Sequence, residues 1–126
     1  DDLSRGLGDV YKRQNSSLRP TIIDNLIFTI SNEGYLFIID DRTGNILRIT
    51  DILNNFKNRE NIKPIGFIHG RHKLFVSLNN GQIISINSIT GEQQKITKVH
   101  GSKVSRPYIF KNSMYLIKDN AVSKIN

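Results

Sequence analysis

Residues 26–47, LIFTISNEGYLFIIDDRTGNIL, recur later in the chain, and this recurrence is the strongest indication of the fold. They return as KLFVSLNNGQIISINSITGEQQ over residues 73–94, with each matched pair 47 positions apart. The matched residues are Asn32 with Asn79, Gly34 with Gly81, Asp40 with Asn87, Thr43 with Thr90, and Gly44 with Gly91. An internal period of this length predicts a protein built from repeated supersecondary units.

A third copy begins in residues 107–126, PYIFKNSMYLIKDNAVSKIN, at a shift of 87 positions from the first. Pro, Ile and Asn recur in it, as Pro107, Ile109 and Asn112 after Pro20, Ile22 and Asn25. The chain therefore holds about two and a half copies of the unit.

Each copy has the pattern of short strands separated by tight turns. A glycine in the NEG and NNG turns can adopt the positive φ of a hairpin turn without steric cost. Asp40 and Asn87 are placed to accept hydrogen bonds from the amides of the turn that follows them. The expected strands are residues 21–23, 26–31, 35–40 and 46–50, then 65–69, 73–78, 82–87 and 93–97, then 108–110, 113–118 and 121–125.

The strands carry apolar side chains on both faces, as in YLFII at 35–39, whereas a half-solvated antiparallel sheet alternates apolar and polar residues. A radial stack of four-stranded sheets covers both faces, and blades of about 40 to 50 residues are typical of propellers. We therefore expect an all-β fold, a fragment of a β-propeller with about two and a half four-stranded antiparallel blades. We expect residues 15–126 to form this partial propeller, with a first blade at about 20–50, a linker at 51–63, a second blade at about 64–98 and an incomplete third blade at about 107–126.

Such a fragment leaves one apolar sheet face uncovered at each end, because the faces of a blade are normally buried by its neighbours. We expect these faces to be drawn from Ile27, Leu36, Phe37 and Ile38 in the first blade, and from Met114, Tyr115, Leu116 and Ile117 in the third. Residues 15–126 are therefore expected to self-associate when they are expressed alone.

Residues 20–47 resemble the PQQ-like, or quinoprotein-type, β-propeller repeat. They have its order of features: Pro, an apolar pair, Asp-Asn, an apolar strand, Asn-x-Gly, a second apolar strand and Asp-x-x-Thr-Gly. The resemblance covers most of residues 20–126. The family commonly has a tryptophan soon after Thr-Gly, but this chain has no tryptophan, and Ile49 and Ile96 stand near that position. The blades of this chain therefore cannot dock through the tryptophan of the family repeat.

Within this family, the chain is most similar to the carboxy-terminal blades of the outer-membrane assembly lipoproteins of Gram-negative bacteria. The long linker TDILNNFKNRENIKP and an ending after the third strand of a blade favour this group. The resemblance implies a non-catalytic, periplasmic scaffold that binds the periplasmic domains of the β-barrel assembly machinery and helps to insert β-barrel proteins into the outer membrane. It also implies a lipid anchor on a missing N-terminal segment as the only membrane contact.

Two alternatives remain open at this stage. The chain could be a fragment of a PQQ-dependent dehydrogenase, an enzyme that uses a quinone, calcium and a catalytic carboxylate at the centre of the ring. It could also be a sensor or a cytosolic propeller that serves as a binding module. A longer sequence on the N-terminal side would separate the three hypotheses.

Residues 1–14 do not fit the repeat, and DVYKRQ at 9–14 is the in-frame translation of the end of a transposon adaptor used in DNA sequencing. We therefore interpret residues 1–14 as an adaptor-derived artefact, which we expect to be disordered. On this interpretation the protein begins at about Asn15 and the chain is a fragment.

The sequence predicts no catalytic, cofactor-binding or metal-binding residues, and hence no cofactor and no enzyme. His69 and His72 fall on a hairpin turn without a third ligand, and His100 is expected in a loop. Asp40 is expected to cap a turn. Together with the adjacent Asp41 it does not provide the spaced oxygen ligands of a calcium-binding loop. Cysteine is absent, which removes thiolate ligands and disulfides from consideration.

The net charge is +7, and it lies entirely in residues 15–126 because the acids and bases of residues 1–14 cancel. The basic residues lie in loops and at strand ends without interleaved aromatic residues, so no nucleic-acid partner is expected. They are Lys57, Arg59 and Lys63 in the linker, Arg71, His72 and Lys73 in a turn, and Lys95, Lys98, Lys103 and Arg106 around the last connection.

The linker has the pattern of a short helix capped by Asp51, with Ile52, Leu53 and Phe56 on one face. That face is expected to pack on the edge of the first blade. Two interpretations are possible: an insertion that covers the edge of a sheet, or a protrusion that binds a partner.

Overall fold

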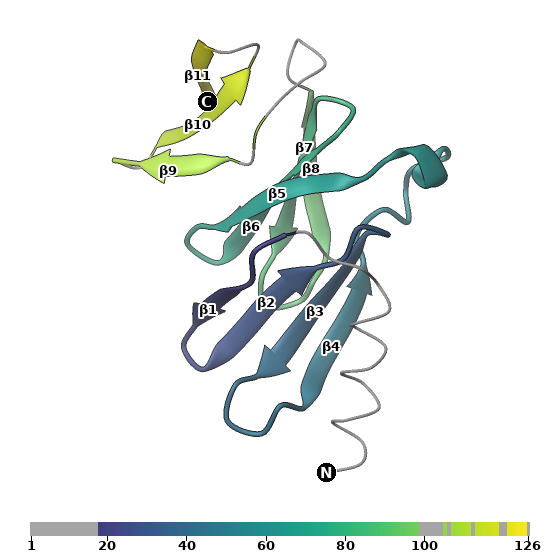
Figure 1. The fold of residues 1–126 in the computed structure, drawn as a ribbon, viewed down its shortest axis with the longest axis vertical. Helices are drawn as coiled ribbons and strands as arrows, with labels where there is room; N and C mark the ends of the chain where they lie inside the picture. The colour runs from purple at the N-terminus through teal and green to yellow at the C-terminus, as the bar shows by residue number, and fades with distance from the viewer. Residues whose placement is uncertain (1–17, 99–104, 106, 112, 119–120, 126) are drawn as a thin grey trace.

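The structure is a computed structural model that describes residues 18–98, 105, 107–111, 113–118 and 121–125. Eleven strands and one 3₁₀ helix form within those residues, and the strands make three antiparallel sheets that follow one another along the chain (Figure 1). No helix in this part of the chain is long and apolar enough to cross a membrane. The expected all-β fold, a partial propeller, is confirmed.

The first two sheets have four strands each, arranged in sequence order. The strands of the first sheet are β1 (Thr21–Ile23), β2 (Leu26–Ile30), β3 (Tyr35–Asp40) and β4 (Ile46–Asp51). Those of the second are β5 (Pro64–His69), β6 (Lys73–Leu78), β7 (Gln82–Asn87) and β8 (Gln93–Lys98). The third sheet has the order β11-β10-β9, with β9 (Tyr108–Phe110), β10 (Ser113–Lys118) and β11 (Ala121–Ile125).

Each expected strand is present, and its ends differ from the expectation by at most one residue. The two copies also share an irregularity in strand pairing. The register shifts between Ile38 and Ile39 in the first sheet and between Ser85 and Ile86 in the second. These positions are again 47 residues apart. The copies therefore share the local bend that a bulge introduces as well as their strands.

The Thr-Gly turns form as the sequence predicts. The Asp40 carboxylate accepts a hydrogen bond from the Arg42 amide at 2.8 Å. Asn87 Oδ1 likewise accepts hydrogen bonds from the amides of Ile89 and Thr90 at 2.8 and 3.0 Å. An amide oxygen thus replaces a carboxylate oxygen in the same role, which explains why Asn can stand in for Asp.

The first two sheets pack face to face and share the main hydrophobic core. We call the face of a sheet that is turned toward the next sheet its forward face, and the opposite face its rear face. Alternation along the strands puts Phe28, Ile30, Leu36 and Ile38 on the forward face of the first sheet, and Leu74, Val76, Ile84 and Ile86 on the rear face of the second. The four residues on each side are almost completely buried.

A smaller core joins the second and third sheets. Ile83 and Phe75 on the forward face of the second sheet pack against Leu116 and Met114 on the rear face of the third. The forward face of the third sheet is largely exposed, with Phe110 62% exposed and Val122 74% exposed.

These contacts correct the expected composition of the two end faces. Leu36, Phe37 and Ile38 are buried, and Leu36 and Ile38 point toward the second sheet. Met114 and Leu116 also point toward the second sheet, so only Tyr115 and Ile117 of the expected set lie on the outward face. Successive side chains of a strand point to opposite faces, so consecutive residues such as Leu36, Phe37 and Ile38 cannot all belong to one end face.

Candidate binding sites between the first two sheets

The linker begins with a turn rather than the expected helix. Asp51 is the last residue of β4 and is paired with Tyr35, so its backbone belongs to the sheet. Its carboxylate accepts a hydrogen bond from the Leu53 amide at 3.1 Å, and the Phe56 amide donates to the Leu53 carbonyl. The helical geometry is confined to the 3₁₀ helix η1 (Arg59–Asn61). The side-chain cap predicted at Asp51 therefore forms, but the helix prediction was wrong, because the chain after Asp51 makes only a turn.

The expected packing of the linker is nevertheless observed. Ile52 and Leu53 are 2% and 0% exposed and belong to the core shared by the first two sheets. Gly34 makes this approach possible, because a Cβ atom there would lie 2.5 Å from Leu53 Cδ1. The Ile52 amide also donates to the Gly34 carbonyl at 2.9 Å. This part of the linker therefore covers the end of the first sheet.

Arg59 connects the later part of the linker to the end of the first sheet. Its guanidinium donates to both carboxylate oxygens of Asp51, with Nη2 at 2.8 Å from Oδ1, and it lies 5.7 Å from the centroid of the Tyr35 ring. The hydrogen bond to Asp51 is the main cause that raises the pKa of Arg59 above its ordinary value. We call Asp51, Arg59 and Tyr35 the linker clamp. The clamp could not be predicted from the sequence, whose pattern indicates a helix cap at Asp51 and places Arg59 among the basic residues of the linker.

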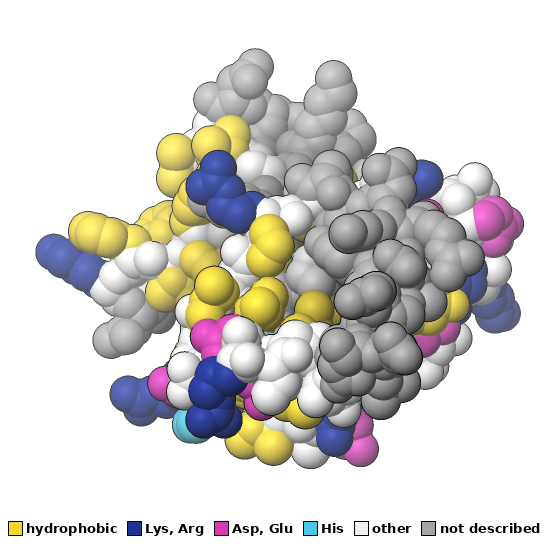
Figure 2. All heavy atoms as spheres, turned by 60° about the horizontal axis from the view of Figure 1, so that its bottom comes forward, with side chains coloured by type: hydrophobic (Ala, Val, Ile, Leu, Met, Phe, Trp, Pro, Cys, Tyr) yellow, Lys and Arg dark blue, Asp and Glu magenta, His cyan; other side chains and the backbone are white. Residues whose placement is uncertain are grey.

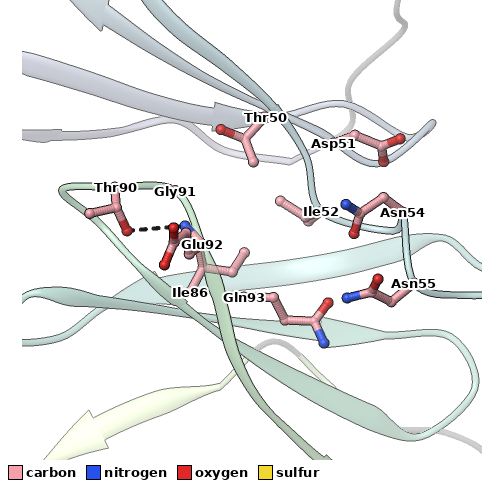
Figure 3. A pocket seen from close by; sticks show the side chains of 10 residues that line it. All are labelled: Thr50, Asp51, Ile52, Asn54, Asn55, Ile86, Thr90, Gly91, Glu92 and Gln93. Atoms are coloured by element: carbon pink, nitrogen blue, oxygen red, sulfur yellow. Dashed lines mark hydrogen bonds between the residues drawn. The ribbon is translucent and has the colours of Figure 1, made fainter.

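A pocket of about 390 Å³ lies where the linker meets the second sheet (Figure 3). We call it the linker pocket; its lining residues are Thr50, Asp51, Ile52, Asn54, Asn55, Ile86, Thr90, Gly91, Glu92 and Gln93. Figure 3 shows side-chain amides, hydroxyls and carboxylates around the opening. Thr90 Oγ1 accepts a hydrogen bond from the Glu92 amide at 3.2 Å, so part of this polar lining is already engaged in the turn.

A second pocket, of about 450 Å³, is formed by strand ends and turns of both sheets. We call it the turn pocket; its lining residues are Ile23, Asp24, Leu26, Phe28, Ile38, Leu47, Arg48, His69, His72, Ser88 and Ile89. The Arg48 guanidinium donates to the Ile89 carbonyl at 2.9 Å and so connects the first sheet to the turn after β7. Most of the pocket lining is apolar, and the polar groups come from five residues.

His69 lies in the wall of the turn pocket. Its ring centroid is 5.0 Å from that of Phe28, and the side chain is half-buried. Burial, and to a lesser extent the neighbouring His72, lowers the pKa of His69 below its ordinary value. This lowering favours the neutral imidazole at neutral pH, where it forms part of the pocket wall beside Phe28.

The described residues contain no group of three or more His, Cys, Asp or Glu residues that could hold a metal ion. His72 is exposed on the turn between β5 and β6, as expected, whereas His100 lies outside the described residues. Asp40 caps its turn and forms an ion pair with Arg42 at 3.6 Å, and Asp41 is exposed. The prediction that the chain has no catalytic, cofactor or metal residues stays a prediction.

The basic residues of the described part do not gather at one place. Lys57 and Lys63 are exposed in the linker, and Lys95 and Lys98 on β8. The turn with Arg71, His72 and Lys73 lies at the far end of β5 from the linker. Lys103, Arg106 and residues 1–14 lie outside the described residues.

No family profile matches the sequence, and no curated protein matches it either. Solved structures do match in fold. One is BamB from Moraxella catarrhalis, with a TM-score of 0.65 and 16% identity over 87% of this chain and 32% of that one. Another is the quinohemoprotein alcohol dehydrogenase of Comamonas testosteroni, with a TM-score of 0.63 and 18% identity over 81% of this chain and 17% of that one.

A third match is the quinohemoprotein alcohol dehydrogenase ADHIIG from Pseudomonas putida HK5, with a TM-score of 0.65 and 15% identity over 84% of this chain and 17% of that one. This chain thus spans about a third of the BamB chain and less of the two dehydrogenases. At such identities the likeness concerns the fold. The expected resemblance to PQQ-like β-propellers, BamB among them, is confirmed.

Proposed function

We propose that this chain is part of a non-catalytic protein-interaction scaffold that resembles BamB and acts in the insertion of β-barrel proteins into the outer membrane. Its partners are the periplasmic domains of the β-barrel assembly machinery. The protein works in the periplasm of a Gram-negative bacterium, and its membrane contact is a lipid anchor on a preceding segment. The likeness in fold to BamB over 87% of the chain supports this choice.

The observation that carries the proposal is the exposed apolar rim of the turn pocket. Leu47 and Ile89 stand on opposite sides of the junction between the first two sheets, and they are 57% and 68% exposed. Exposed apolar side chains grouped at a pocket mark surfaces that bind other proteins. The pocket is built from strand ends and short turns of two packed sheets, and a site built on a packed scaffold loses less entropy when it binds.

A direct binding measurement tests this function. We would immobilise the chain and titrate purified periplasmic domains of a Gram-negative β-barrel assembly machinery by biolayer interferometry. Saturable binding to at least one such domain is the expected result, and the double variant Leu47→Ser/Ile89→Ser shows separately whether the turn pocket is the site. Absence of saturable binding to every such domain would contradict the proposed function.

The two dehydrogenase matches favour a second candidate, because their TM-scores of 0.63 and 0.65 are similar to that of BamB. On this alternative the chain is a piece of a quinone-dependent dehydrogenase. Equilibrium dialysis of the chain with pyrroloquinoline quinone and calcium separates the two candidates. The scaffold predicts no stoichiometric binding, whereas saturable binding of one quinone per chain would favour the enzyme.

A further inference from the structure

We propose that the turn pocket binds an acidic segment of a partner protein, with one apolar side chain inserted between the two sheets and flanking carboxylates at the basic part of the rim. This inference rests on the proposed scaffold function and specifies the chemistry of the partner. It arises from the floor of the pocket, the donors on its rim and the charge of the whole chain.

The floor of the pocket suits an aliphatic or aromatic side chain. Phe28 and Ile38 are 3% and 5% exposed, and they form the base at the end of the shared core. Leu47 and Ile89 extend the apolar surface outward on both sides. A volume of about 450 Å³ lies within the range of small-ligand pockets and exceeds what one side chain occupies. Part of a peptide can therefore enter with its anchor residue.

The rim of the pocket offers hydrogen-bond donors to an anion. The exposed Arg48 uses one guanidinium nitrogen on the Ile89 carbonyl, and a guanidinium has five N–H donors in all. His72 lines the same pocket and is exposed, and it is flanked in sequence by the exposed cations Arg71 and Lys73. A carboxylate at this rim can therefore form a charge-assisted hydrogen bond with Arg48.

Acidic groups also lie at or near the pocket, and one of them is paired with a base. Asp24 is the one carboxylate among the lining residues. Asp41 is exposed, and its backbone amide donates a hydrogen bond to the Asn25 carbonyl. Asp40 is paired with Arg42 at 3.6 Å. The chain as a whole carries +7, so its long-range field attracts an acidic partner and repels a basic one. Figure 2 shows hydrophobic side chains on the surface close to Lys and Arg side chains.

Peptide display tests the proposal without a known partner. The complete chain, biotinylated and immobilised at low density, is used to select from a library of random 12-residue peptides displayed on phage. Enrichment of peptides with one Leu, Ile or Phe flanked by Asp or Glu is the expected result. Selected peptides should bind the double variant Leu47→Ser/Ile89→Ser at least tenfold more weakly, and Ile96→Ser is the matched control because this 40% exposed β8 residue lies outside the pocket.

Arg48 gives a second readout. For a selected peptide synthesised without the phage, affinity measured by fluorescence anisotropy should fall severalfold between 50 and 300 mM salt. The fall should be smaller for Arg48→Gln and restored toward the original value for Arg48→Lys, and circular dichroism of each variant checks that it is folded. Enrichment of basic peptides, equal binding to the double variant, or binding only to anionic phosphatidylglycerol vesicles would overturn the proposal.

The two proposals fail separately. If the machinery domains do not bind but pocket-dependent acidic peptides do, the anchor site stands and the scaffold function in outer-membrane assembly is wrong. If those domains bind equally well to the wild-type chain and to Leu47→Ser/Ile89→Ser, the function stands and the anchor site is wrong.

Discussion

Gly44 and Gly91 occupy matched positions in two copies of the repeat, with φ angles of +76° and +77°. Their surroundings differ. A Cβ atom on Gly44 would meet nothing within 4 Å, whereas one on Gly91 would lie 2.6 Å from Thr50 Oγ1 in the first sheet. Both positions therefore require a residue that tolerates a positive φ, but only position 91 also lacks space for a side chain.

This pair gives a prediction with an internal control. Gly44→Ala should lower the free energy of unfolding by about 1 kcal/mol, the cost of a left-handed alanine. Gly91→Ala should lower it by about 1 to 3 kcal/mol more, because the Thr50 and Arg48 side chains of the first sheet must move away. Urea denaturation followed by circular dichroism measures both. Equal losses in the two variants would show that the turn of the second sheet does not press on the first.

His69 predicts a pH dependence of stability. Its pKa is lowered in the folded chain, mainly by burial, so the folded state binds fewer protons than the unfolded state near pH 6.5. The stability contribution is therefore complete above about pH 6.5 and is lost as the pH falls below that value. Urea midpoints at pH 7.5 and pH 5.5 measure the loss, and His69→Gln should reduce it. An unchanged pH dependence in His69→Gln would assign the effect to other groups.

At the scale of elements, the linker clamp connects η1 to the end of β4. Both side chains are about one-third exposed, Arg59 at 33% and Asp51 at 30%, so solvent screens their attraction. A bidentate ion pair at this exposure should still contribute about 1 kcal/mol to the free energy of unfolding, the upper part of the range for exposed pairs. Its main role is to hold the linker against Tyr35 rather than to stabilise the whole fold.

A double-mutant cycle tests the clamp. Asp51→Asn, Arg59→Gln and the double variant should give a coupling free energy of about 0.5 to 1 kcal/mol in urea denaturation, decreasing in 0.5 M salt. The matched control pairs Arg42→Gln with Asp40→Asn, where Arg42 is 73% exposed and the coupling should be smaller. A coupling near zero for Asp51 and Arg59 would show that the clamp contributes no stability.

The strands could be predicted from the sequence because their signals are local. Turn glycines, the Asp or Asn cap and the apolar runs recur within each copy, and each strand formed within one residue of the expected limits. The predicted linker helix is absent, and the residues after Asp51 are held by distant partners instead: the Ile52 amide donates to the Gly34 carbonyl, and Leu53 is buried in the core of the first two sheets. A local pattern does not contain that constraint.

The binding sites could not be predicted for a related reason. The turn pocket brings Leu47 and Arg48 next to Ile89, about 40 positions away, and this contact exists only after two sheets have packed. The sequence did draw attention to His69 and His72, but as a solvated turn rather than as a pocket wall. Repeats predict that sheets stack, yet they do not specify which side chains meet at the ends of the interface.

For the molecule as a whole, the repeat means that residues buried between two sheets have counterparts on the exposed face of the third sheet. Phe28 and Ile30 on the forward face of the first sheet correspond, 87 positions later, to Tyr115 and Ile117 on the forward face of the third. The first pair is 3% and 0% exposed because the second sheet covers it, whereas Ile117 is 45% exposed. The forward face of the third sheet is thus a surface of the kind that this chain elsewhere packs against a rear face.

The first sheet carries exposed apolar residues on its rear side as well. Ile22 and Ile49 are 64% and 46% exposed, whereas Phe37, which is paired with Ile49 on the same face, is 1% exposed. Two copies can therefore associate head to tail, the third sheet of one on the first sheet of the other. Covering a few hundred Å² at about 25 cal/mol per Å² stabilises such contacts by several kcal/mol, and a head-to-tail contact does not stop at a dimer.

We therefore expect the chain to self-associate as its concentration rises, in agreement with the expectation from the sequence. Sedimentation velocity from micromolar to near-millimolar concentration should show a rising average mass. Phe110→Lys/Val122→Lys should shift the onset to at least tenfold higher concentration, because it places two charges on the exposed forward face of the third sheet. Ile96→Lys is the control, since this residue lies on β8 of the second sheet and is 40% exposed. A monomer at every concentration, or an equal shift in the control, would show that the end faces do not attract each other.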